Sequence, residues 1–318
     1  MTSARPKTDG THGFTQPSDE RVRAEPAVAR IQARKPIVLV LGMARSGTSA
    51  TARVLAECGA RLPKNVLPAN RHNPTGFWEP TAAVRINARI LAASGSSFFD
   101  TTLRVDDIGD TSIREQFVEE ITNFLIDSDA NNDSCPLIVK DPRISNLLPI
   151  WLDAIALAGL DPRIVIPVRP PIEVAISLNH WKGVSLKHSA ELWLKYNLLA
   201  ERGTRHLPRK FVAYRRLLED WRAELVSIEA VLGLALHPSE QVESFLDPSL
   251  RRARPEQNGG ELLNVPWLNE IERELEKACG TVAPDQSVLD AAYRWIGDAQ
   301  TAGELRTVRK FGTDFGIT

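Results

Sequence analysis

Short apolar runs alternate with longer stretches of helical periodicity along most of the chain. Four of these runs are rich in β-branched or aromatic residues and are nearly continuous, which predicts buried strands. They span residues 37–41, 137–139, 163–168 and 211–214. Strands that alternate with helices favour an α/β fold in which a parallel sheet is flanked by helices.

Helices are predicted between and after these strands. One indication is the apolar stripe from Ile113 to Leu125, which repeats every four residues as on one face of a helix. Another is Pro170-Pro171, because proline fits the first turn of a helix, where no intrahelical N–H is needed. The expected helices span residues 48–58, 80–93, 143–157, 171–181, 185–205 and 217–231. From about Pro238 the chain is expected to be mainly helical, with loops.

The first 35 residues differ from the rest of the chain. They are rich in Arg, Pro, Thr, Ser and Ala and show little apolar periodicity, which predicts a disordered leader. No internal repeat follows. We therefore expect residues 36–318 to form a single domain with a helical C-terminal part.

Charge and cysteine content exclude several classes of protein. The 318 residues carry 39 Lys and Arg against 40 Asp and Glu, without the basic excess typical of nucleic-acid binding. Cys58, Cys135 and Cys279 are widely spaced and form no Cys/His cluster, which predicts free thiols in a reducing compartment and no zinc site. No signal-peptide run or membrane-length apolar stretch is present. We expect a soluble, cytoplasmic protein.

The segment between the first strand and the first helix carries the first chemical signal. Residues 42–49 read Gly-Met-Ala-Arg-Ser-Gly-Thr-Ser, and a small-residue loop in this place can wrap a phosphate with backbone N–H groups. Gly42 and Gly47 have Walker A spacing, but Thr48 stands where the Walker lysine would be. Magnesium-dependent ATP or GTP hydrolysis is therefore disfavoured. The cation of this loop is Arg45 instead.

A second phosphate motif follows the strand at 163–168. Arg169 ends that strand, and Ser177 lies eight positions later on the next helix. A guanidinium is a rigid and permanently charged fork that suits a phosphate dianion, and a hydroxyl can add one more hydrogen bond. The pair therefore predicts a second anion-binding position.

The two motifs together resemble those of bacterial sulfotransferases that use 3′-phosphoadenosine 5′-phosphosulfate (PAPS), members of the P-loop superfamily. The family's 5′-phosphosulfate loop is usually written PKSGTT, and Arg45 stands at its lysine position. Further segments resemble the family at residues 73–79, 140–143, 214–218 and 245–252. The likeness covers roughly residues 37–254 and implies a three-layer sulfotransferase-like fold.

The resemblance implies which residues bind PAPS and its product 3′,5′-ADP. The 5′-phosphosulfate would be held by the loop residues Arg45, Ser46, Gly47, Thr48 and Ser49. The 3′-phosphate would be held by Arg169 and Ser177. No metal is required in this scheme.

Catalytic roles are also expected. A cation at the bridging oxygen of the leaving group stabilises the transition state, and we assign this role to Arg45, with help from Lys140. The acceptor hydroxyl needs a general base. Glu79 is the first candidate, by likeness to other members of the superfamily, and His72 and Asp141 are alternatives.

The chain also departs from the family. The histidine base of the eukaryotic cytosolic enzymes has no match, because Asp141-Pro142 occupies that stretch. The C-terminal Arg-Lys-Gly motif has none either. Two groups of basic residues remain as substitutes for that motif: Arg251, Arg252 and Arg254, or Arg309 and Lys310.

Sulfuryl transfer to a hydroxyl acceptor is the function that these motifs favour. By resemblance to bacterial members, the acceptor would be a carbohydrate, a glycolipid or a small alcohol, and Trp78, Trp181 and Trp193 are candidates for stacking on a sugar. Two other functions remain open. One is an atypical P-loop kinase, and the other is a non-catalytic sulfotransferase-like binding protein.

Overall fold

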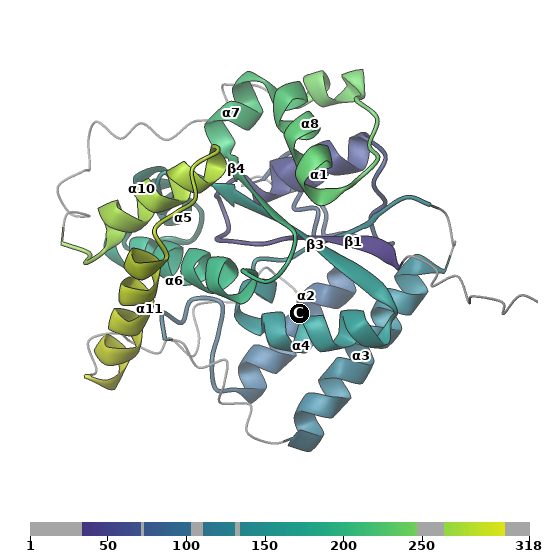
Figure 1. Cartoon of the computed structure of the whole chain (residues 1–318). Coiled ribbons are helices and arrows are strands. Elements are labelled where there is room, and N and C mark those ends of the chain that lie inside the picture. Colours follow the sequence, from purple (N-terminus) through teal and green to yellow (C-terminus); the bar gives the residue numbers. More distant parts are fainter. Residues whose placement is uncertain (1–33, 71–72, 103–110, 131–133, 247–263, 303–318) are drawn as a thin grey trace, which may run out of the picture. The chain divides into compact units, whose positions relative to one another are not determined.

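The computed structural model describes residues 34–70, 73–102, 111–130, 134–246 and 264–302 (Figure 1). Within them, four parallel strands form one sheet in the order β2-β1-β3-β4. The strands are β1 Lys35–Val40, β2 Leu137–Lys140, β3 Leu160–Val168 and β4 Arg209–Ala213. The predicted parallel sheet flanked by helices is therefore confirmed. Of the predicted leader, residues 1–33 lie outside the described part of the chain.

Helices occupy most of the remaining described residues. Those before the third strand are α1 Thr48–Glu57, α2 Thr81–Ala93, α3 Thr111–Asp129 and α4 Ile144–Leu157. Those after it are α5 Pro171–Lys182, α6 Leu186–Gly203, α7 Tyr214–Glu219, α8 Trp221–Leu232, the 3₁₀ helix η2 Glu240–Ser244, α10 Leu268–Cys279 and α11 Gln286–Thr301.

Alternate residues of each strand point to opposite faces of the sheet, and each face has its own apolar core. On β1, Ile37 and Leu39 pack with α2, α3, α4, α5 and α6. Val38 and Val40 pack on the other face, with α1, α7 and α8. Figure 1 shows the sheet between these two layers of helices. Both faces are covered, which explains why the strands are continuous apolar runs.

Two predicted elements differ from the structure. The helix predicted over 217–231 is two helices, α7 and α8, because Asp220 interrupts it. The Asp220 carboxylate accepts a hydrogen bond from the Ala223 N–H and thereby begins α8. Tyr214, predicted at the end of a strand, opens α7 instead. Ile113, predicted in the apolar stripe of a helix, is 37% exposed, whereas Leu125 of the same stripe is buried.

The strand order reverses its direction at β1. The chain runs from β1 to β2 on one side of β1 and then returns to pair β3 on its other side. In open parallel sheets, ligands bind beside such a switch point, outside the carboxyl ends of the strands. Among the described residues, no helix has the length and hydropathy to cross a membrane.

Candidate active site

The predicted site residues gather at the carboxyl edge of the sheet. Because the four strands are parallel, the segments that follow them meet at this edge. β1 leads into the predicted phosphate loop, residues 42–49, whose last two residues begin α1, and β2 ends at Lys140. β3 leads into Arg169, and β4 leads into Tyr214. Lys140 and Arg169 therefore come from β2 and β3, the strands on either side of β1, which leads into the loop.

The phosphate loop is held in a conformation that few residue types adopt. Gly42, Arg45 and Gly47 have positive φ angles of 96°, 70° and 98°. Glycine adopts such angles freely, whereas an arginine there is uncommon and is held by its surroundings. The Gly42 N–H donates to the Ser145 hydroxyl at 2.9 Å, which ties the start of the loop to α4.

Ser46 is the residue of the loop that best indicates a ligand. Its side chain is fully buried, and its hydroxyl has no hydrogen-bond partner among the described residues. A buried hydroxyl without a partner is costly. A phosphate oxygen held by the loop and by the N-terminus of α1 would supply that partner.

Gly47 is packed too tightly for any other residue. A Cβ at this position would lie 2.3 Å from Cδ2 of Tyr214 and would also require φ near +98°. We expect Gly47→Ala to lower the free energy of unfolding by about 2 kcal/mol or more, from backbone strain and steric overlap together. Urea denaturation measures the change.

Gly95→Ala is the matched control for this prediction. Gly95 also has a positive φ, +66°, but a Cβ there meets no atom within 4 Å. Gly95→Ala therefore carries a milder left-handed strain and no steric overlap. If Gly47→Ala destabilises the protein no more than Gly95→Ala does, the packing of Tyr214 against the loop is not a constraint.

Arg45, Ser177 and Arg169, predicted from two separate motifs, form one cluster. Nε of Arg45 donates to the Ser177 hydroxyl at 2.9 Å. Nη1 of Arg169 donates to the backbone oxygen of Arg45 at 3.2 Å. The second phosphate motif therefore contacts the cation of the first loop directly, and two guanidinium groups lie at the same end of the sheet.

Arg169 is itself fixed by three contacts. Its Nε lies 2.9 Å from the Glu173 carboxylate, one helical turn further on, and both side chains are buried. Its guanidinium lies over the ring of Tyr214, 4.9 Å from the centroid. Its backbone oxygen accepts from Nε1 of Trp193 at 3.0 Å. Such a preorganised guanidinium loses little entropy when it binds an anion.

Glu79 and Lys140 form a second cluster beside the loop. Nζ of Lys140 lies 2.5 Å from Oε1 of Glu79, and each side chain is only 2% exposed. The same ammonium donates to the Ser49 hydroxyl and to the Phe77 backbone oxygen, each at 3.2 Å. The predicted catalytic pair is therefore brought together, and Ser49 connects it to the phosphate loop.

The environment of Glu79 suits proton transfer. Burial raises the pKa of its carboxyl above the ordinary 4.5, although the Lys140 ammonium opposes this shift. Oε2 of Glu79 has no hydrogen-bond partner among the described residues. One oxygen is thus oriented by Lys140, and the other remains able to accept a proton.

The alternative bases are placed differently. Asp141 is fully buried. Its carboxylate accepts hydrogen bonds from Asn87 at 2.9 Å and from the Arg143 guanidinium at 3.0 Å. These bonds hold the Asp141 carboxylate in place. His72, like all the C-terminal basic residues proposed for the 3′-phosphate, lies outside the described residues.

Several residues at the site were not predicted as site residues. Glu173 follows Arg169 by four positions, a spacing that could have indicated a helical ion pair. Tyr214 and the backbone oxygen of Phe77 gave no such signal, because their contacts depend on long-range packing. Of the three tryptophans considered for stacking, Trp193 is fully buried, and Nε1 of Trp78 is bonded to the Thr75 oxygen. Trp181 lies beside Arg45.

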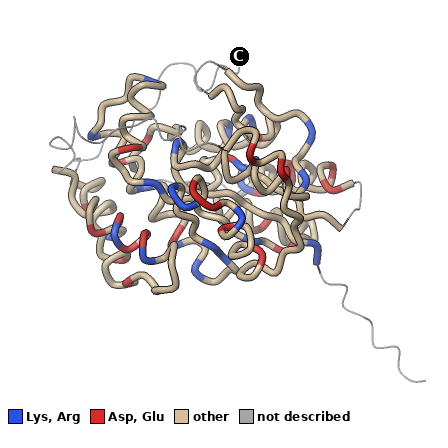
Figure 2. Tube along the Cα trace, turned by 90° about the horizontal axis from the view of Figure 1, so that it is seen from above, with Lys and Arg blue, Asp and Glu red and all other residues tan. Residues whose placement is uncertain are grey.

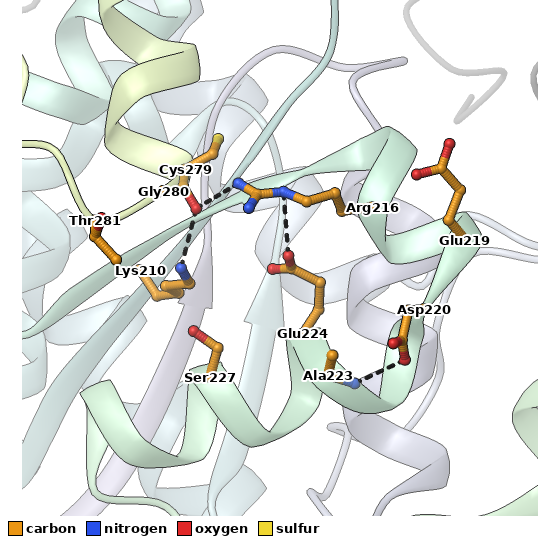
Figure 3. Close-up of a pocket in the computed structure, with 10 residues that line it drawn as sticks. All are labelled: Lys210, Arg216, Glu219, Asp220, Ala223, Glu224, Ser227, Cys279, Gly280 and Thr281. Atoms are coloured by element: carbon orange, nitrogen blue, oxygen red, sulfur yellow. Dashed lines mark hydrogen bonds and ion pairs between the residues drawn. The ribbon is translucent and has the colours of Figure 1, made fainter.

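A separate cleft of about 460 Å³ lies between β4, α8 and the end of α10 (Figure 3). Lys210 and Arg216 both donate to the backbone oxygen of Cys279, the last residue of α10. Arg216 also lies 3.5 Å from the Glu224 carboxylate. These contacts satisfy the C-terminal end of a helix. None of the predicted site residues lines this cleft.

Charge elsewhere on the described chain is mixed. Figure 2 shows Lys and Arg interspersed with Asp and Glu along the trace. Many of them pair, as Arg89 does with Glu120 and Arg202 with Asp290. The described residues contain no group of three or more His, Cys, Asp or Glu side chains that could hold a metal ion.

No family model and no curated protein matches the chain. Three similar solved structures are sulfotransferases. The domain of the Synechococcus PCC 7002 olefin synthase is 16% identical, with a TM-score of 0.40, over 83% of this chain and 96% of that one. The domain of the curacin biosynthetic pathway is 15% identical, with a TM-score of 0.42, over 83% and 99%. STF9 of Mycobacterium avium is 12% identical, with a TM-score of 0.41, over 86% and 78%. Likeness this distant does not establish an activity.

Proposed function

We propose that this protein transfers a sulfuryl group from PAPS to a hydroxyl acceptor. The observation that carries the proposal is the cluster of Arg45, Ser177 and Arg169. It joins a phosphate loop whose cation is an arginine to a second anion-binding motif on the neighbouring strand. A donor with two separate anionic groups, such as PAPS, requires two such motifs side by side.

The residues at the sheet edge have distinct roles in this proposal. The loop residues 45–49 hold the 5′-phosphosulfate, and the Ser46 hydroxyl gains the partner that it lacks. Arg169 and Ser177 hold the 3′-phosphate. PAPS supplies a sulfuryl group on a good leaving group. Negative charge that develops on that leaving group is stabilised by Arg45 and Lys140.

Glu79 accepts the proton of the acceptor hydroxyl in this proposal. Lys140 lies 2.5 Å from one of its oxygens and favours the ionised form, although burial raises the pKa of this carboxyl overall. The acceptor is proposed to be a carbohydrate, a glycolipid or a small alcohol.

Titration calorimetry with 3′,5′-ADP, in the absence of magnesium, tests the donor site. We expect the wild-type protein to bind 3′,5′-ADP and to prefer it over AMP and ATP. Arg45→Ala and Arg169→Ala should each weaken binding by about 10- to 100-fold, because each removes a charge-assisted contact to an anion. Arg89→Ala is the control, since its exposed guanidinium pairs with Glu120 on another helix.

The same titration, repeated with magnesium, distinguishes sulfuryl transfer from the two other functions, a P-loop kinase and a non-catalytic binding protein. Binding of ATP only with magnesium would support the kinase and overturn the proposal. Unchanged binding in both arginine variants would also overturn it. Binding of 3′,5′-ADP without transfer from PAPS to any carbohydrate, glycolipid or alcohol acceptor would favour a non-catalytic binding protein.

A further inference from the structure

The side chain of Arg45 is oriented by one face of α5. Ser177 and Trp181 lie four positions apart on this helix, so their side chains project from the same face. Ser177 accepts a hydrogen bond from Nε of Arg45 at 2.9 Å. The guanidinium carbon of Arg45 lies 5.7 Å from the centroid of the Trp181 ring, within the range of a cation–π contact.

Trp181 is held in place from a second direction. The rings of Phe77 and Trp181 are 6.2 Å apart between centroids, and they are tilted by 40°. Phe77 belongs to the segment that leads into Glu79, and its backbone oxygen accepts a hydrogen bond from Lys140. The Trp181 ring therefore contacts both Arg45 and the segment that leads into Glu79.

We propose that Trp181 is a positioning residue that fixes the Arg45 guanidinium for sulfuryl transfer. The proposal rests on the proposed function. An arginine side chain has many rotamers, and its charge stabilises a transition state only where it is already aimed. The Arg169 bond fixes the backbone of Arg45, and the Ser177 bond fixes Nε. The Trp181 ring adds a contact to the guanidinium carbon itself, 5.7 Å from the ring centroid.

The experiment compares turnover and nucleotide binding in Trp181→Leu and Trp181→Phe. A cation–π contact corresponds to about a 2- to 30-fold effect on an equilibrium or a rate. We expect Trp181→Leu to lower kcat by about 10-fold and to change the Kd of 3′,5′-ADP by less than about 3-fold. Trp181→Phe keeps an aromatic face and should recover most of the lost kcat.

Trp295→Leu is the matched control. Trp295 is also a partly buried tryptophan packed on the same core, but it lies on α11 and is not among the residues that contact Arg45 in the described structure. Its replacement should lower the melting temperature without lowering kcat in the remaining folded protein. Equal losses of kcat in both leucine variants, after correction for the folded fraction, would overturn the proposal.

A second comparison tests whether Trp181 acts through Arg45 or contributes to catalysis independently of it. In an Arg45→Gln background, Trp181→Leu should have little further effect on kcat, because the charge that Trp181 positions is gone. An equal fold-loss in both backgrounds would show that Trp181 acts without Arg45. If the wild-type protein binds no 3′,5′-ADP, the proposed function itself fails, and that outcome is visible before any variant is made.

Discussion

Glu79→Gln is expected to lower kcat for sulfuryl transfer by about 100- to 10,000-fold, the usual contribution of a general base. Glutamine keeps the shape and one acceptor oxygen of the side chain but cannot take a proton. The Kd of 3′,5′-ADP should change little, because Glu79 contacts Lys140 and not the proposed phosphate-binding groups.

The pH dependence of the wild-type protein provides a second measurement. Glu79 acts as a base only when it is ionised, and burial raises its pKa above 4.5. Activity should therefore rise with pH, and the midpoint of that rise should lie above 4.5. Glu79→Gln should lose the pH-dependent rise in kcat.

Glu115→Gln serves as the control, because Glu115 is an exposed residue of α3. Retention of wild-type kcat in Glu79→Gln would remove Glu79 from the reaction. His72 would then become the first candidate for the base.

Lys140→Met is expected to lower the free energy of unfolding by about 3–5 kcal/mol, because it leaves a buried carboxylate without its partner. The Lys140 and Glu79 side chains are each 2% exposed, so water cannot replace the lost ammonium. Chemical denaturation measures the difference. Lys187→Met is the control, since that exposed lysine lies 3.9 Å from Glu191.

The loss in Lys140→Met should depend on pH. Without Lys140, the pKa of Glu79 in the folded protein rises further, so the folded state binds a proton that the unfolded state releases above about pH 4.5. Stability therefore falls as pH rises above this value, and the deficit should be larger at pH 8 than at pH 5.

The double variant Lys140→Met, Glu79→Leu completes a double-mutant cycle with the two single variants. It removes both charges and should recover part of the lost stability, because an apolar pair of similar size replaces the ion pair. If the double variant is less stable than the sum of the two single losses predicts, the unpaired Glu79 carboxylate is not the cause of the loss in Lys140→Met.

The sheet and the glycine-containing loop after β1 could be predicted from local sequence. Short runs of β-branched residues predicted all four strands, since both faces of the sheet are buried. The glycines at 42 and 47 predicted a phosphate loop, because their spacing between a strand and a helix is a local property. The start of α6 was also close to its prediction, and Ser185 is its N-cap.

Contacts between distant segments could not be predicted in the same way. Nothing local indicates that Arg45 donates to Ser177, 132 positions away, or that Tyr214 packs on Gly47. The break between α7 and α8 was missed because the apolar pattern continues across Asp220. There, a side chain that caps a helix outweighs periodicity.

The pairing of β1 has a consequence for synthesis of the chain on the ribosome. Among the described strands, β1 pairs with β2 and β3, and Val38 lies opposite Arg163, 125 positions further on. At about 5–20 residues per second, β1 would leave the ribosome roughly 6–25 s before β3 is complete. β2, the other neighbour of β1, follows it by 100 positions (Ile37 pairs with Leu137), so residues 37–40 have no neighbouring strand for about the first 5–20 s. Until β2 is made, these residues are an unpaired apolar segment of the nascent protein, of the kind that chaperones shield.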